Sequence, residues 1–267
     1  MLKRKRSSTT RISKYLNDIK TFDLEDLDLE RQILHGGYDI IVHCATEYGR
    51  RNTAVSDVIS ANLLLPLRIL ELSMRAGTRV FVNTDTILDR RISHYSLSKK
   101  QFREWLLAIR SDQIRVNVMI EHFYGPGDDS TKFLSAIVDD LLNVVDRIPL
   151  TAGSQKRDFV HVNDVVDAFA IIMREALVRP TIGCVDYQIG AGSAVSIREV
   201  VELLKALSGN LRTELGFGDL PMREGEIMSI EADLKALHAL GWRPKFTLSE
   251  GLRTMIEREK ELRRCAL

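Results

Sequence analysis

The sequence predicts an α/β fold built around a parallel sheet. Three observations carry this prediction: short apolar runs alternate with helix-length segments, the runs are rich in β-branched residues, and the intervening segments repeat apolar residues at helical spacing. Strands covered by helices on both faces are expected to be apolar throughout, as these runs largely are. The chain has 267 residues, 45% of them hydrophobic, which is enough for a substantial core.

The composition excludes several classes of protein. A formal net charge of +1 argues against a general nucleic-acid or membrane binder. Cys44, Cys184 and Cys265 are odd in number and far apart, so we expect neither a disulfide framework nor a cysteine metal site, and we expect a reducing, cytoplasmic location. No apolar run approaches the roughly 20 residues of a membrane span. The basic N-terminus has no apolar stretch behind it and is not a secretory signal.

The first half supplies the clearest elements. The apolar runs at 39–43, 79–83 and 115–120 are predicted strands. Between them, 56–76 and 95–109 are predicted helices, and Gly77 is expected to end the first of these.

The second half differs in its sequence pattern and begins with a segment at 123–129 whose composition predicts a loop. The helices predicted beyond it are 131–145, 165–175 capped by Asn163 or Asp164, one starting at Ser196 with Glu199 in a capping box, and 248–262. The predicted strands are 148–151, 157–162 and 184–189. We therefore divide the chain at 1–122 and 123–267, with the second part expected to interleave with the first.

Tyr95 and Lys99 are the first residues that suggest chemistry. Residues four apart on a helix share a face, so the ammonium can approach the phenol. A lysine there is expected to lower the phenol pKa and make the tyrosine an acid or base near neutral pH. The pattern also arises by chance, and an ordinary exposed helix face is the alternative.

The neighbouring sequence narrows this choice. The ordered motifs are His43-Cys44-Ala45-Thr46, Thr84-Asp85-Thr86, the Tyr95/Lys99 pair, Tyr124-Gly125-Pro126-Gly127, Arg157-Asp158-Phe159 and Leu240-Gly241-Trp242. This set resembles the extended short-chain dehydrogenase/reductase family, the NAD-dependent epimerases and dehydratases of nucleotide sugars. The resemblance implies a Rossmann-type parallel sheet with a smaller C-terminal α+β substrate lobe, NAD or NADP as cofactor, and a nucleotide-sugar substrate.

The short stretch from Asn83 to Lys99 resembles the small deoxysugar epimerases and reductases of cell-surface polysaccharide synthesis. The resemblance implies that Thr84, Tyr95 and Lys99 are the catalytic residues. Tyr95 would exchange a proton with the sugar oxygen, Lys99 would hold the nicotinamide ribose, and Thr84 would hydrogen-bond the sugar oxygen. Asp85 matches one acid of the dehydratases' acidic pair, or is a turn residue.

The resemblance also implies binding residues. His43, Ala45 and Thr46 match the strand end beside the nicotinamide ribose. Asp23 with Leu24 matches the adenine contact, although Asp23 could simply belong to an acidic loop.

On the substrate side, the resemblance implies contacts from Tyr124, Arg157 and Arg223. A guanidinium suits a diphosphate because its fork of donors matches phosphate oxygens. Surface ion pairs are the alternative for both arginines.

One departure from the family stands out. The first glycines are Gly36 and Gly37, and no strand followed by a GxxGxxG loop precedes the predicted strand at 39–43. We therefore expect the family's first strand and phosphate loop to be missing from the sheet. A start placed too late, a segment supplied by another chain, and a non-catalytic member that binds a nucleotide sugar or regulates a partner are the explanations left open.

The resemblance also implies a homodimer, formed through the helices at 56–76 and 95–109. Exposed Phe102, Trp105 and Leu106 would suit that interface, or these residues would pack on the sheet.

Overall fold

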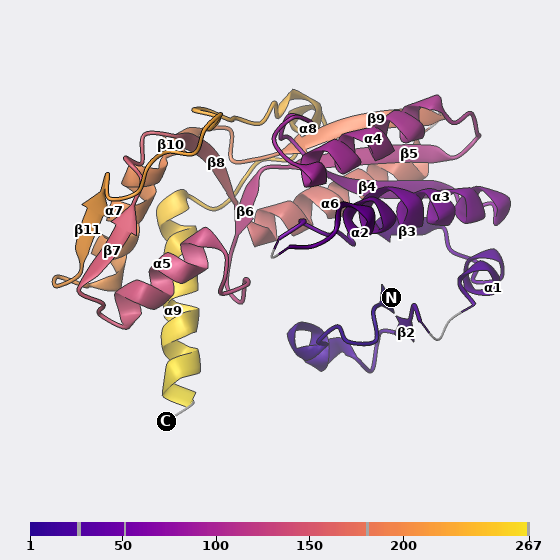
Figure 1. The fold of residues 1–267 in the computed structure, drawn as a ribbon. Coiled ribbons are helices and arrows are strands. Elements are labelled where there is room, and N and C mark those ends of the chain that lie inside the picture. Colours follow the sequence, from indigo (N-terminus) through magenta and orange to yellow (C-terminus); the bar gives the residue numbers. More distant parts are fainter. Residues whose placement is uncertain (26–27, 51, 180–181, 266–267) are drawn as a thin grey trace.

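The computed structural model describes residues 1–25, 28–50, 52–179 and 182–265. Its main sheet contains β3 (Ile40–His43), β4 (Val80–Thr86), β5 (Ile114–Ile120) and β9 (Gly183–Ile189). These four strands pair in that order and are all parallel (Figure 1). The predicted α/β fold and its parallel sheet are thus confirmed.

Helices cover both faces of this sheet. One face carries α3 (Leu65–Arg75) and α4 (His94–Ala108), and α6 (Val162–Val178) lies on the other (Figure 1). Neighbouring residues of β4 divide between the two faces: Phe81 packs with α3 and α4, while Val80 and Val82 pack with α6. Alternation along a strand produces this division and explains why the run is apolar throughout.

The helix predicted at 56–76 is interrupted. The structure has α2 (Val55–Ile59), then a π-helical segment (Ser60–Leu64), then α3. Helix α3 ends where expected, with Gly77 at φ +72°. On α4, Phe102 and Leu106 are fully buried against the sheet, whereas Trp105 is 48% exposed. Of the two alternatives expected for these residues, packing on the sheet holds for Phe102 and Leu106, which lie on the sheet-facing side of the helix, and exposure holds for Trp105.

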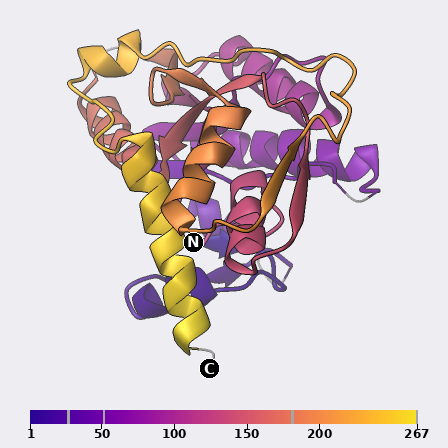
Figure 2. The same cartoon turned by 90° about the vertical axis from the view of Figure 1, so that its left-hand side faces the viewer.

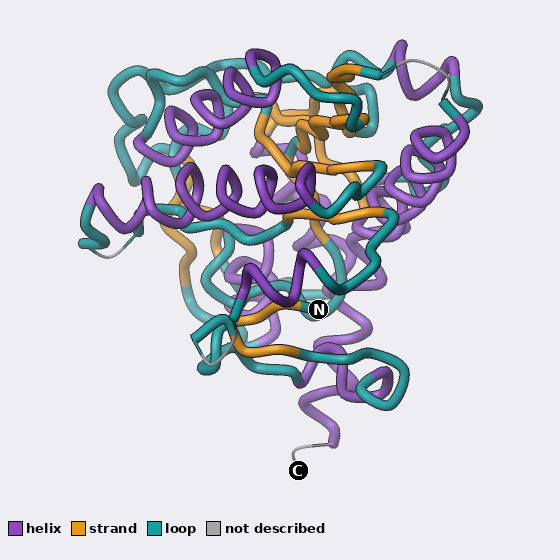
Figure 3. The backbone as a smooth tube through the Cα atoms, turned by 90° about the vertical axis from the view of Figure 1, so that its right-hand side faces the viewer, coloured by secondary structure: helices purple, strands orange, loops and turns teal. Residues whose placement is uncertain are grey.

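The N-terminal segment forms a small unit of its own. Strands β1 (Leu2–Lys3) and β2 (Phe22–Asp23) pair in parallel with each other, and the short helix η1 (Thr10–Tyr15) lies between them in sequence. Helix α1 (Leu29–Leu34) follows and packs with α3 through Leu29 and Ile33. Among the described strands, β1 pairs only with β2, and β3 only with β4 (Figure 3).

A second lobe lies beside the main sheet (Figures 1 and 2). Its sheets contain β6 (His122–Tyr124), β8 (Lys156–His161) and β10 (Ala194–Ser196), and separately β7 (Arg147–Leu150) with β11 (Glu214–Phe217). Its helices are α5 (Phe133–Leu142), α7 (Ile197–Ser208) and α9 (Leu248–Cys265), which share one apolar core. Among the described helices, none combines the length and apolar character needed to cross a membrane.

The two halves of the chain interleave. Strand β9, helix α6 and the short helix α8 (Lys235–Ala239) come from the second half but belong to the core of the main sheet. Helix α6 also begins earlier than expected. His161 is its N-cap and accepts a hydrogen bond from Asn163 N, so the predicted cap at Asn163 or Asp164 is wrong. Asp164 instead accepts from the backbone of Lys245 and Phe246.

Candidate active site

The predicted catalytic residues meet at the carboxyl end of β4. Lys99 is 1% exposed, and its Nζ donates to the backbone oxygen of Thr84 at 2.7 Å. Burial lowers the pKa of Lys99 to about 8, although the charge of Asp85 opposes this shift. The ammonium is thus held beneath the strand end on which Thr84 lies.

Tyr95 lies in the first turn of α4. Ser93 and Ser96 form a capping box at this helix start, in which Ser93 Oγ accepts from Ser96 N at 3.1 Å. This box fixes the turn that carries Tyr95. The ring of Tyr95 packs on that of Tyr48, with centroids 5.0 Å apart.

The pKa of the Tyr95 phenol differs from expectation. Burial raises its pKa, Tyr48 and Asp85 add to this effect, and a side-chain hydrogen bond with Thr86 opposes it. The Lys99 ammonium donates to the Thr84 carbonyl. The pKa of the phenol is thus raised, whereas the sequence led us to expect a lowered value.

Two side chains near the end of β4 already interact with other residues of the chain. Thr84 Oγ1 donates to the backbone oxygen of His43 at 3.1 Å, which leaves its oxygen free to accept. The carboxylate of Asp85 is fully buried and lies 3.3 Å from Lys100 Nζ. It also accepts from Asn117 Nδ2 at 3.1 Å. These contacts hold the Asp85 carboxylate beneath α4.

A row of polar side chains crosses the sheet under α4. His43, Asn83, Asn117 and Asp186 are paired in register on adjacent strands. His43 Nδ1 lies 3.2 Å from Asn83 Oδ1, and Asn83 Nδ2 donates to Asn117 Oδ1 at 2.8 Å. Asn117 Nδ2 in turn lies 3.2 Å from Asp186 Oδ1. Sequence analysis named His43 but missed the other three residues of this row, because their pairing depends on strand register, which local patterns do not encode.

His43 is buried within that row. Burial lowers its pKa to about 4, with a further contribution from the charge of Lys99. Among the described residues, none hydrogen-bonds its Nε2. His43 is therefore a neutral strand residue at physiological pH.

The segment after β3 is held by Asn62, a residue that sequence analysis also missed. Asn62 is fully buried in the π-helical segment, and its Oδ1 accepts from Glu47 N at 2.8 Å and from Thr46 Oγ1 at 3.3 Å. Its Nδ2 donates to Glu47 O at 2.8 Å and to Ser98 Oγ at 3.1 Å. The sequence did offer one signal for Asn62, because it is a polar residue within the otherwise apolar spacing of the predicted helix 56–76. Ala45 lies on this segment and is exposed.

The other predicted binding residues lie farther out. Asp23 forms an ion pair with Lys3 of the neighbouring strand, and Leu24 packs at the edge of the α1–α3–α4 core. Arg157 is buried and donates to Ile227 O at 2.7 Å and to the carboxylate of Glu226. Arg223 is exposed on the same loop.

Tyr124 lies in the core of the lobe. Its ring is buried, and its hydroxyl donates to Leu248 O at 3.4 Å. Burial raises the pKa of this phenol. The ring is therefore part of the apolar core of the lobe.

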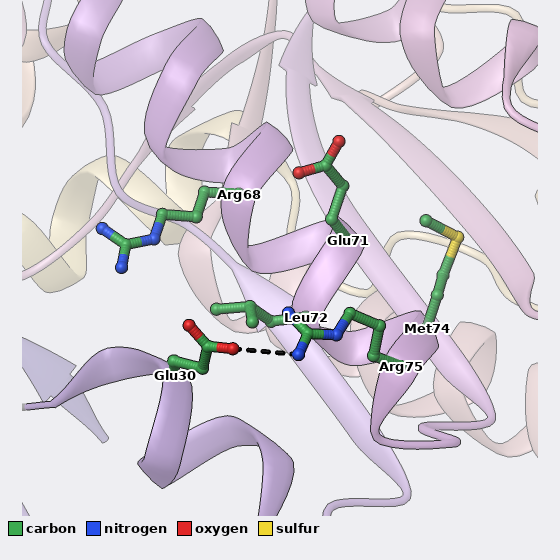
Figure 4. A pocket seen from close by; sticks show the side chains of 6 residues that line it. All are labelled: Glu30, Arg68, Glu71, Leu72, Met74 and Arg75. Atoms are coloured by element: carbon green, nitrogen blue, oxygen red, sulfur yellow. Dashed lines mark ion pairs between the residues drawn. The ribbon is translucent and has the colours of Figure 1, made fainter.

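A hollow between α1 and α3 lies apart from these residues. Glu30 of α1 and Arg75 of α3 form an ion pair of 2.9 Å across it, with Arg68 and Glu71 beside them (Figure 4). None of the predicted site residues lines it. In the described part of the chain, no group of three or more histidine, cysteine, aspartate or glutamate side chains could hold a metal ion.

Comparison with known proteins gives consistent results. The sequence model of the NAD dependent epimerase/dehydratase family matches residues 1–190. A CDP-abequose synthase from Salmonella typhimurium is 33% identical over 227 residues, which cover 82% of this chain and 75% of that protein. The CDP-abequose synthase of Salmonella muenchen is 31% identical, over 96% of this chain and 87% of its own length.

Solved structures share the fold. MoeE5 in complex with UDP-glucose and NAD superposes with a TM-score of 0.76 at 26% identity, covering 91% of this chain and 86% of that one. The epimerase Mth375 of Methanothermobacter thermautotrophicus superposes with a TM-score of 0.80 at 19% identity, covering 99% and 85% of the two chains. The second likeness concerns the fold alone.

Proposed function

The chain belongs to the NAD-dependent epimerase/dehydratase family, and from this we propose that it reduces or epimerises a nucleotide-activated sugar through a 4-keto intermediate. The observation that carries the proposal is the convergence of Thr84, Tyr95 and Lys99 at one strand end. The name of the two Salmonella relatives, CDP-abequose synthase, supports a nucleotide-activated sugar as the substrate, and we propose that the product serves cell-surface polysaccharide synthesis.

The residues around Lys99 suit the ribose of a nicotinamide cofactor. An ammonium carries three donors, and the described hydrogen bond to Thr84 O uses one of them. The others remain for ribose hydroxyls. NAD or NADP bound here supplies or accepts the hydride, and the chain supplies orientation and a proton. His43, Ala45 and Thr46 would line the ribose, and Asp23 with Leu24 would meet the adenine.

Side chains of the protein transfer the proton and bind the substrate. Tyr95 donates a proton to, or takes one from, the sugar oxygen at C4, and the Thr84 hydroxyl hydrogen-bonds that oxygen. Asp85 positions α4 through Lys100. Arg157 and Arg223 bind the diphosphate, and Glu226 must then share or release the Arg157 guanidinium.

A non-catalytic nucleotide-sugar binder is the second candidate. The raised pKa of Tyr95 favours it, since a phenol that holds its proton tightly is a poor base at neutral pH. Tyr95→Phe separates the two candidates. An enzyme should lose about a hundredfold or more in turnover of a nucleotide 4-keto-sugar with NADPH while keeping its affinity for both ligands. Equal behaviour of variant and wild type would support the binder.

Calorimetric titration with NADH and NADPH tests the cofactor directly. Saturable binding by the folded 267-residue chain is expected, and its absence would exclude dehydrogenase chemistry for this polypeptide.

A homodimer through α4 and the α2–α3 helices is also proposed, because Trp105 and Leu64 leave apolar surface exposed there. A monomer mass in light scattering across concentrations would exclude it.

A further inference from the structure

Two carboxylates beneath α4 share a single buried amide, that of Asn117. Asn117 lies in the middle of β5 and is fully buried. Its Nδ2 donates to Asp85 Oδ2 at 3.1 Å and to Asp186 Oδ1 at 3.2 Å, and its Oδ1 accepts from the side chain of Asn83. The amide therefore uses both of its N–H donors, one for a carboxylate of β4 and one for a carboxylate of β9.

Each of these carboxylates also holds a cation of α4. Asp85 Oδ2 lies 3.3 Å from Nζ of Lys100. Asp186 accepts from Nε of Arg103 at 3.1 Å and from Nη2 of the same guanidinium. Lys100 and Arg103 are three residues apart and so lie on one side of the helix. The helix is thus fixed to the sheet at two points that one amide joins. We call the five residues that make these contacts the helix clamp: Asp85, Lys100, Arg103, Asn117 and Asp186.

The helix clamp lies directly beside the residues proposed to carry the reaction. The ammonium of Lys99 donates to Thr84 O at 2.7 Å, one residue before Asp85. Asp85 Oδ1 accepts from the backbone N–H of Thr86 at 2.7 Å, and the side chain of Thr86 hydrogen-bonds Tyr95. Tyr95 itself lies in the first turn of the clamped helix. A shift of α4 over the sheet would therefore change the position of Tyr95 relative to Thr84.

A primary amide suits the centre of the helix clamp because it offers two donors and carries no charge. Without it, two negative carboxylates would lie on either side of β5 with no donor between them, and like charges repel. A charged donor there would compete with Lys100 and Arg103 for the same oxygens. The carboxylate of Asp85 is fully buried, so the loss of one of its partners cannot be made good by water. Removal of the amide should therefore weaken both contacts of α4 with the sheet.

We propose that Asn117 is a positioning residue for the proposed reaction, because its amide fixes α4 so that Tyr95 and Thr84 meet the same sugar oxygen. This inference rests on the proposed function and adds a residue to it. Because Asn117 is buried inside the sheet, it acts through Asp85 and Asp186 rather than by contact with a ligand.

Steady-state kinetics of Asn117→Leu test this inference. The assay follows oxidation of saturating NADPH, and in parallel of NADH, with the 4-keto-6-deoxyglucose derivatives of CDP and UDP as probes. A misplacement of about 1 Å is costly even from a remote position, so kcat should fall about ten- to a hundredfold. KM for the sugar should change by less than about twofold, because the proposed diphosphate contacts, Arg157 and Arg223, lie outside the helix clamp.

Gln113→Leu is the matched control for lost stability. Gln113 is another buried amide, placed just before β5 at the opposite end of the sheet. Its Nε2 donates to Thr78 O at 2.8 Å and to Ser73 Oγ at 3.0 Å. This variant should lose stability in urea unfolding much as Asn117→Leu does, and it should keep the wild-type kcat.

The outcomes separate the inference from the proposed function. A folded Asn117→Leu with the wild-type kcat overturns the inference and leaves the proposed function standing. An equal fall of kcat in Gln113→Leu also overturns it, since lost stability would then explain the effect. If Asn117→Leu does not fold, Arg103→Gln opens the helix clamp at its partly exposed end and should show the same fall in kcat, and an unchanged kcat there overturns the inference. A wild-type chain that reduces neither probe with either cofactor overturns the proposed function and the inference together.

Discussion

At the scale of single residues, burial of the Lys99 ammonium destabilises the folded chain. Its pKa of about 8 in the folded chain lies below the 10.5 of an exposed lysine, so between these values the unfolded state binds more protons. Stability should therefore rise as the pH increases through this window, and below about pH 8 the buried ammonium should cost about 3 kcal/mol. The fold tolerates this cost where the proposed cofactor would bind.

Lys99→Met should consequently be inactive and yet more stable than wild type at neutral pH. The expected gain is about 1–3 kcal/mol in urea unfolding, because the Thr84 carbonyl loses its partner while the desolvated charge disappears. The gain should vanish as the pH approaches 10.5. Lys100→Met is the matched control and should destabilise the chain, since it leaves the buried Asp85 carboxylate without its lysine. A destabilised Lys99→Met at pH 7 would contradict this account.

His43 gives a second pH dependence of stability, in an acidic rather than an alkaline range. Its folded pKa of about 4 lies below the 6.5 of a free imidazole, so the unfolded state binds more protons between these values. Stability should be complete above about pH 6.5 and should fall toward pH 4, by about 3 kcal/mol from this group. Denaturation of wild type and His43→Asn across that range measures it: the difference between the two should shrink as the pH falls. A constant difference would contradict the assignment.

At the scale of elements, the π-helical segment links two parts of the site. It turns Asn62 toward both the segment after β3 and helix α4, and one amide makes four hydrogen bonds there. Such π-helical turns often occur at functional positions. Asn62 thus ties the proposed nicotinamide contact at Thr46 to the helix of Tyr95.

Asn62→Leu should separate these two elements while keeping the side-chain volume. The backbone N–H and oxygen of Glu47 lose their partners, so we expect a loss of about 2–3 kcal/mol. Hydrogen exchange should become faster at residues 45–48, with strand β5 unaffected. Ser98→Ala removes one of the four bonds and should cost about 1 kcal/mol. Unchanged exchange in Asn62→Leu would show that the segment is held by other contacts.

The sequence predicted most of these elements and only part of the site. Strands β3, β4, β5 and β9 were found within a few residues, because a two-sided apolar strand has a strong pattern. The capping box of Ser196 and Glu199 was also found. The π-helical interruption was not, since it keeps nearly the same apolar spacing as an α-helix. Asn117, Asp186 and the partners of Arg157 depend on strand register and loop contacts that local patterns do not encode.

At the scale of the whole molecule, the order of elements joins the two halves into one core. Val80 and Val82 from the first half pack with Ile172 of α6, Ile189 of β9 and Trp242 from the second. The indole N–H of Trp242 donates to Asp164 O at 3.2 Å and so holds the chain after α8 against α6. Division at residue 122 would expose one entire face of the main sheet.

A fragment of residues 1–122 should therefore not fold alone. It would keep the α3–α4 face but lose β9, which pairs with β5 from Ile114 to Ile120, and the helix that covers Val80 and Val82. Expressed by itself, the fragment should lack a cooperative unfolding transition and should bind the dye ANS, which reports exposed apolar surface. Expressed together with residues 123–267, it should become soluble and co-purify with that partner. Cooperative unfolding of the isolated fragment would instead show that α1, α3 and α4 give the sheet a sufficient core, and that the second half only adds the substrate lobe.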